Sequence, residues 1–275
     1  MKDDCSENPR LRGATVGWPN RVWALLGKPA VAPAVLAGLA VALWPSPAAA
    51  MHISEGILPA SWAGLWFLVA VPVVMWGLRT INRRRATDPR WVTMVALVGS
   101  AVFVTSCMPV PLPSGTCSHP CGTGLGALLI GPGPTVVVAS VALLLQALFL
   151  AHGGLTTLGA NIVSMGIVGA YAAYGTFWFL RKFRLPLLPA AFAAGLLGDW
   201  ATYVATSLEL SAGTHADGSF WAMAVALMLA FVPTQVPLGI AEGIVTAIAY
   251  RFVLERRPDL VALRHGLQQG LGIRD

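Results

Sequence analysis

Two short segments of the chain place histidine where it could bind a metal ion. Met51 and His52 directly follow the small-residue run PSPAAA, and His119 lies in the polar segment PSGTCSHPCGTG. A free terminus at Met51 would offer three nitrogens in sequence: its α-amine, the deprotonated His52 amide and the His52 Nδ1. Such a set is planar, and planar nitrogen coordination suits divalent ions late in the first transition series. His119 could fill the fourth position of that plane.

This chemistry requires that the mature chain begins at Met51. A basic segment and a mostly apolar stretch over residues 29–44 precede small residues at Ala48 and Ala50. This order is typical of a secretory signal peptide, so we predict cleavage between Ala50 and Met51. The alternative is an uncleaved anchor helix, against which two prolines and the Ala-X-Ala end argue. Translation starting at Met51 would give the same terminus.

The composition indicates a membrane protein. Hydrophobic residues make up 56% of the 275-residue chain and charged residues only 11%, against roughly 25% charged in soluble domains. Apolar runs cover residues 62–79, 91–108, 122–131, 134–151, 156–180, 186–208 and 219–253. The third is short, and the last is long enough to kink at Pro233 or Pro237. We therefore predict an all-α integral membrane protein with about seven transmembrane helices.

The basic residues predict how these helices are oriented. Arginine and lysine cluster after the first, fifth and last apolar runs, which makes those ends cytoplasmic by the positive-inside rule. With an odd number of spans, the N-terminus lies outside and the C-terminus in the cytoplasm. The segments expected outside are Met51, residues 109–121, the turn at His152 and the loop 209–219. The predicted organisation is a signal peptide (1–50), a transmembrane metal-binding domain (51–255) and a cytoplasmic polar tail (256–275).

Three further polar residues could support the metal ligands. Glu55 follows His52 by three residues, His152 begins the polar break HGGLTTLGAN, and Asn161 lies nine residues after His152. A metal-bound imidazole commonly needs an acceptor for its other nitrogen, and Glu55 could serve. His152 could orient the ligands or line the entry path. A position at the start of a helix explains Glu55 nearly as well.

The cysteines and the intramembrane acids leave alternatives open. Cys117 and Cys121 flank His119 and could be thiolate ligands, a local disulfide or small packed residues. Asp199 and Glu242 lie within or near the ends of apolar runs, where ionisable groups are costly and often functional. Hydrogen-bonded packing between helices explains these two acids equally well.

Five longer strings carry a resemblance to a known family: MHISEGILPASW, GTCSHPCGTGLGA, LLLQALFLAHGGLTTLGANIVSMGIVG, GDWATYVATSLEL and VPLGIAEGIVT. They resemble the motifs of the CbiM family, the cobalt-binding substrate component of energy-coupling factor transporters, which is related to the nickel component NikM. The resemblance spans most of residues 51–254. It implies about seven helices, an inward-tucked N-terminal segment, and Met51, His52 and His119 as metal ligands. Cys121 departs from the family, which more often has a small hydroxyl residue there.

The resemblance also implies a function. The chain would capture Co²⁺ for import in cobalamin biosynthesis, in a bacterial cell (inner) membrane. The expected partners are a transmembrane coupling protein, ATPase subunits, a small accessory membrane protein and membrane lipid, but no nucleic acid. The chain would not be an enzyme, because it has neither a Walker A sequence nor a His-Glu-X-X-His motif. The alternatives are the same role for Ni²⁺ and a membrane metal sensor that does not transport. The segments CSHP and LAHGGLTTLGAN resemble the cobalt branch of the family more than the nickel branch, which favours cobalt.

Overall fold

The computed structural model describes residues 49–50, 52–108, 110–111, 116–215 and 218–257. All of them belong to one compact unit, residues 47–275. The predicted signal peptide, its cleavage point and the cytoplasmic tail therefore lie almost wholly outside the described residues.

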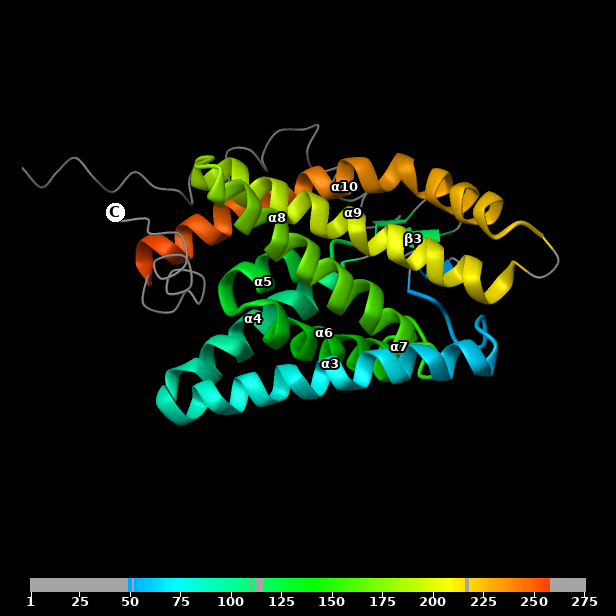
Figure 1. Ribbon diagram of the computed structural model, residues 1–275, viewed down its shortest axis with the longest axis horizontal. Coiled ribbons are helices and arrows are strands. Elements are labelled where there is room, and N and C mark those ends of the chain that lie inside the picture. The colour runs from blue at the N-terminus through cyan, green and yellow to red at the C-terminus, as the bar shows by residue number, and fades with distance from the viewer. Residues whose placement is uncertain (1–48, 51, 109, 112–115, 216–217, 258–275) are drawn as a thin grey trace, which may run out of the picture. The chain divides into compact units, whose positions relative to one another are not determined.

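The described chain is almost entirely helical (Figure 1). The helices are α3 (Ala60–Thr87), α4 (Arg90–Ser106), α5 (Thr123–Ile130), α6 (Pro132–Phe149), α7 (Leu158–Asn161), the π-helix η2 (Ile162–Gly169), α8 (Ala170–Lys182), α9 (Leu187–Thr214) and α10 (Phe220–Arg256). α7, η2 and α8 follow one another without a break. Three short strands form a small sheet in the order β1 (Ala49–Ala50), β3 (Thr116–Ser118), β2 (Val110–Pro111). β1 pairs with β3 in parallel and β2 pairs with β3 antiparallel.

The helices coincide with the apolar runs, and proline and glycine mark several of their ends. α3 and α9 begin directly after Pro59 and Pro186, where a fixed φ suits a helix start. Gly131, at φ +87°, separates α5 from α6 in a conformation that an L side chain rarely adopts. α10 continues as one helix through Pro233 and Pro237.

Within the described residues, five helices are long and apolar enough to cross a membrane: α3, α6, the continuous helix from α7 to α8, α9 and α10. The chain is therefore a multi-pass membrane protein. α4 is a shorter apolar helix, and α5 has 8 residues. At 1.5 Å per residue α5 is about 12 Å long, against a hydrocarbon core of about 30 Å, so it is too short to span. A count of about seven spans and the orientation of the termini stay predictions.

Part of one segment that we predicted to be a loop is helical. We expected residues 209–219 to form an external loop, but α9 continues to Thr214. Glu209 is therefore a helical residue, and it is buried. The apolar run appeared to end there because an acidic residue lowers hydropathy, although a single buried glutamate does not end a helix.

The short helix α5 lies among longer helices. α9 and α10 pack side by side, and α3 packs against α6 on the other side of α5 (Figure 1). A Cβ at Gly124 would lie 3.1 Å from Gly195 Cα of α9, and a Cβ at Gly126 would lie 3.0 Å from Thr135 Cγ2 of α6. Small residues thus let α5 approach its neighbours closely, as in other membrane helix contacts. The segment that carries His119 enters this packed region directly before α5.

Candidate metal centre

Three histidines meet beside the packed helices. The ring centroids of His52 and His119 are 4.6 Å apart, and that of His152 lies 4.8 Å from His52 and 5.1 Å from His119. One ring nitrogen from each lies within 4.8 Å of the others. His52 and His119 are buried, and His152 is half-buried. The structure thus brings the two predicted imidazole ligands together and adds His152, which we expected only as a supporting residue.

A hydrogen-bond network determines which nitrogen of His52 is free. Gln146 of α6 donates from Nε2 to Ser106 Oγ at 2.6 Å, and Ser106 donates its own proton to Val102 O. The amide oxygen of Gln146 therefore faces His52 Nε2, at 3.1 Å. An amide oxygen only accepts, so Nε2 carries the ring proton and the Nδ1 lone pair is free. Nδ1 is the nitrogen that an amino-terminal chelate would use.

His119 has the opposite tautomer. Its Nδ1 lies 3.1 Å from Pro120 O, which can only accept, so Nδ1 carries the proton. Its Nε2 is buried and has no hydrogen-bond partner among the described residues. Burial lowers the pKa of His52 well below its usual range and that of His119 to about 3, with the neighbouring histidines adding to the effect. Both rings are therefore neutral at neutral pH and can donate a lone pair to a metal.

The turn that carries His152 packs directly on His52. Gly153 has φ +83°, and a Cβ there would lie 3.3 Å from both His52 Cβ and Asn161 Nδ2. Glycine thus permits both the left-handed turn and the close contact. Like His119, His152 has a buried Nε2 without a hydrogen-bond partner in the described part of the chain.

The segment after His52 is held by the start of the α7 helix. Asn161 accepts from Ile53 N–H at 2.9 Å and donates to Ile53 O at 3.2 Å, and Thr157 also donates to Ile53 O. Glu55 is exposed and accepts from Thr156 N–H at 3.1 Å. Hydrogen bonds from the side chain and backbone of Thr156 lower the pKa of Glu55. Asn161 and Glu55, both expected to support the ligands, thus fix the backbone beside His52, while Gln146 is the acceptor for the His52 ring.

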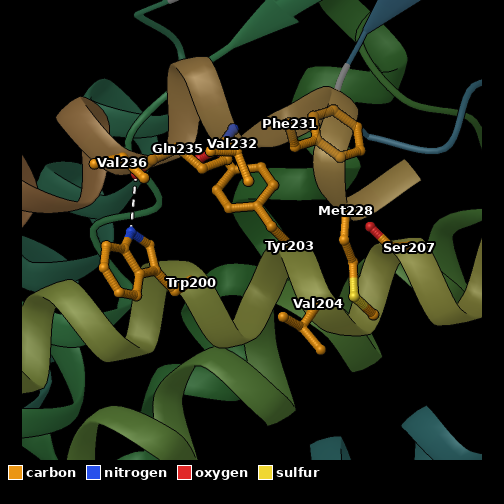
Figure 2. A pocket seen from close by; sticks show the side chains of 9 residues that line it. All are labelled: Trp200, Tyr203, Val204, Ser207, Met228, Phe231, Val232, Gln235 and Val236. Carbon is orange, nitrogen blue, oxygen red and sulfur yellow. Dashed lines mark hydrogen bonds between the residues drawn. The ribbon is translucent and has the colours of Figure 1, made fainter. Parts of the chain in front are cut away.

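The segment around His119 is held by different helices, α9 and α10. Tyr203 of α9 donates to His119 O at 2.9 Å, and Gln235 of α10 donates to Ser118 Oγ at 2.8 Å. Trp200 of α9 in turn donates to Gln235 O at 2.9 Å, across the open apolar pocket between the two helices (Figure 2). The two predicted imidazole ligands are therefore attached to two different groups of helices.

Two predicted participants cannot be placed fully. Met51 lies outside the described residues, and nothing is described of the Cys117 side chain. Cys121 is a buried free thiol, so the predicted alternative of a local disulfide with Cys117 is not formed. Cys121 lies instead beside Asp199 and Glu242.

Sequence reasoning missed Gln146 and Tyr203. Gln146 had a visible signal, since a buried amide in the apolar run LLLQALFL needs a partner. Tyr203 had none, because its bond to His119 O joins residues 84 positions apart.

The helical membrane fold and the convergent neutral imidazoles place this chain among membrane proteins that handle transition metal ions. Comparison with known sequences makes the assignment more specific. The profile of the CbiM family, described as "Cobalt uptake substrate-specific transmembrane region", matches residues 52–260, and the chain belongs to this family.

Individual relatives agree with this assignment. The chain is 52% identical over 217 residues to the cobalt transport protein CbiM of Geobacter sulfurreducens, covering 78% of this chain and 63% of the relative, which is less than two thirds of its length. It is 52% identical over 212 residues to CbiM of Sorangium cellulosum, covering 77% of this chain and 94% of the relative. A crystal structure of a truncated transition metal transporter superposes with a TM-score of 0.66 at 26% identity, covering 74% of this chain and 99% of the other.

The Gln146 network predicts a measurable contribution to metal affinity. Replacing Gln146 by Met removes the acceptor for His52 Nε2–H, so the ring loses its fixed tautomer. We expect Co²⁺ affinity of the purified protein, measured by calorimetric titration, to fall about 10–100-fold, the usual cost of losing such a support. Gln146→Glu keeps an acceptor for His52 Nε2–H but loses the donation to Ser106, so it should retain more of the affinity than Gln146→Met. Unchanged affinity in Gln146→Met would show that the Gln146 hydrogen bond does not determine how His52 binds the metal.

Proposed function

We propose that the chain is the substrate-capture component of an energy-coupling factor transporter that imports Co²⁺ for cobalamin biosynthesis. The observation that carries this proposal is the pair of buried, neutral imidazoles, His52 and His119, that lie side by side in a chain of a cobalt uptake family. Hydrogen bonds leave Nδ1 of His52 and Nε2 of His119 without a proton. Both nitrogens are freed by hydrogen bonds within the protein, so the donor set is prepared before the ion arrives.

The proposed ligand set joins these imidazoles to a processed terminus. Cleavage before Met51 would supply the α-amine, and the His52 amide and Nδ1 would complete three positions of a plane. His119 Nε2 would take the fourth. His152 Nε2, which also lacks a partner in the described structure, is then available for a position outside that plane.

The proposed orientation places this centre on the outer side of a bacterial cell membrane, with the C-terminus in the cytoplasm. The chain has no Walker A sequence, so ATP would be hydrolysed by partner ATPase subunits. A transmembrane coupling protein and a small accessory membrane protein would complete the assembly. In this arrangement the chain binds and releases the ion and catalyses no bond chemistry.

Nickel is the alternative cargo, because a plane of four nitrogens suits Ni²⁺ as well as Co²⁺. We expect cells that carry the chain with its partner subunits to keep most of their Co²⁺ uptake when Ni²⁺ is added in equimolar amount. The measurement is competitive uptake of the two isotopes. Cells without the ATPase subunits provide the control. Preferential Ni²⁺ uptake would make this a nickel component, and metal binding without uptake in the complete assembly would indicate a sensor.

A further inference from the structure

A second cluster of potential metal ligands lies apart from the imidazoles. One ligand atom each from Cys121, Asp199 and Glu242 lies within 4.8 Å of the other two. Cys121 and Asp199 are fully buried, and Glu242 is 4% exposed. Cys121 lies two residues before α5, Asp199 in the middle of α9 and Glu242 in the second half of α10. One thiol and two carboxyl groups thus share a site that is closed to water.

Glu242 already has a structural role in this cluster. It accepts from Cys121 N–H at 2.7 Å and from Gly122 N–H at 2.9 Å, one bond to each carboxylate oxygen. Glu242 therefore fixes the start of α5, where backbone N–H groups lack helical partners. Each carboxylate oxygen can accept more than one bond, so Glu242 could still bind a cation while holding α5.

For Asp199, no comparable hydrogen bonds account for the burial of the carboxyl group. Among the described residues, neither of its oxygens makes a hydrogen bond of normal geometry, although the side chain is fully buried. The polar groups close enough to interact with it are the Cys121 thiol and the Glu242 carboxyl group. The ion pair found in the described chain, Arg251 with Glu255, lies on the exposed surface, and no basic side chain pairs with Asp199. A buried carboxylate that is ionised and has neither a donor nor a cation is strongly unfavourable. Since its oxygens face Cys121 and Glu242, the partner that Asp199 lacks belongs in this cluster.

We propose that Cys121, Asp199 and Glu242 form a second divalent-cation site, separate from the imidazole centre. One thiolate and two carboxylates suit an ion of intermediate softness such as Co²⁺ or Zn²⁺. Binding would release the Cys121 thiol proton, and the ion's two positive charges would offset two of the three negative charges of the thiolate and the two carboxylates. The ion would also give the Asp199 oxygens a partner.

The position of the cluster relates it to the imidazole centre. Tyr203, whose hydroxyl binds His119 O, lies four residues after Asp199, which is about 6 Å along α9. Asp199 lies on the side of Tyr203 nearer the start of α9, which follows the basic cluster at residues 181–184. If the proposed orientation holds, an ion that leaves the imidazoles toward the cytoplasm meets this cluster next. The proposed binding of a cation by Cys121, Asp199 and Glu242 does not require that the chain transports metal.

The test uses the purified full chain under reducing conditions, titrated with Co²⁺ alone. We expect two bound ions per chain and a thiolate-to-cobalt charge-transfer band in the near ultraviolet, which nitrogen ligands do not give. Cys121→Ser should abolish the band and retain one ion, whereas Cys107→Ser, which changes the other free thiol of the described residues, should keep the band. Asp199→Asn should also bind one ion only. His119→Ala should lose the imidazole-bound ion and keep the band.

The outcomes separate this proposal from the proposed function. A single bound ion without a thiolate band in the parental protein would overturn the second site and leave the imidazole centre intact. A band that persists in Cys121→Ser but disappears in Cys117→Ser would also overturn it. If Asp199→Asn fails to fold, the near-isosteric Cys121→Ser variant decides the question alone. A thiolate band in a protein whose imidazoles bind no ion would count against the proposed function only.

Discussion

Inserting one alanine between Met51 and His52 is expected to abolish Co²⁺ uptake while the chain still binds Ni²⁺ or Cu²⁺. The insertion leaves every original side chain in place but moves the imidazole to the third residue of the processed chain. The terminus then has an extra amide nitrogen and can fill all four planar positions by itself. His119 is then displaced from the metal. The terminus still holds the ion, but the segment that carries His119 no longer closes over it. Uptake should fall to background in cells that carry all partner subunits.

Two controls make this insertion informative. N-terminal sequencing of membrane-extracted protein must show that the parental chain begins at Met51, and a retained 1–50 segment in the active protein would exclude the amine as a ligand. An alanine inserted between Thr87 and Asp88, both exposed, should leave uptake unchanged. If His52 and His119 were instead ordinary side-chain ligands of a tetrahedral site, a flexible terminus would tolerate the first insertion. Uptake near the parental rate would therefore refute the chelate.

Replacing His119 by alanine is expected to cost more affinity for Co²⁺ than replacing either His152 or His215. If His119 is the fourth ligand, as proposed, the variant loses a ligand outright, and the loss should exceed the roughly 10–100-fold that follows removal of a supporting contact. Calorimetric titration of the purified variant provides the measurement.

Two other histidines are the natural comparisons for that experiment. His215 bonds Ser211 O at 2.8 Å and lies against Phe220, outside the imidazole cluster, so His215→Ala should bind Co²⁺ like the parent. His152→Ala removes the imidazole proposed to lie outside the plane and should have an intermediate effect. Equal metal retention by the His119 and His215 variants would disprove the assignment of His119.

The sequence predicted the helices well because their signals are local. Apolar runs bounded by proline, glycine and arginine appear as helices, and Gly131 separates α5 from α6. α3 and α9 extend to Thr87 and Thr214, past the predicted ends at residues 79 and 208. The predicted ligands His52 and His119 also meet in the structure. Glu209 is an exception, because hydropathy alone predicts a loop beginning at this residue, whereas it is a buried residue of α9.

The contacts that fix the site could not be predicted from one sequence. His52 meets Gln146 across 94 residues, Ile53 meets Asn161 across 108, and Cys121 meets Glu242 across 121. No spacing rule relates such positions, since the contacts depend on how the helices pack. The sequence gives the chemistry of the donors, and the packing decides which of them share a site.

The division of the imidazoles between two groups of helices has a mechanical consequence. His52 is attached to α6 and, through Ile53, to α7, whereas the segment around His119 is attached to α9 and α10. A nitrogen–metal bond is about 2 Å long and tolerates little stretching. Sliding α9 and α10 by about 1 Å relative to α6 would therefore break one metal bond while every helix stays intact. A partner that presses on the outer surface of α10 could thus loosen the ion without touching a single ligand.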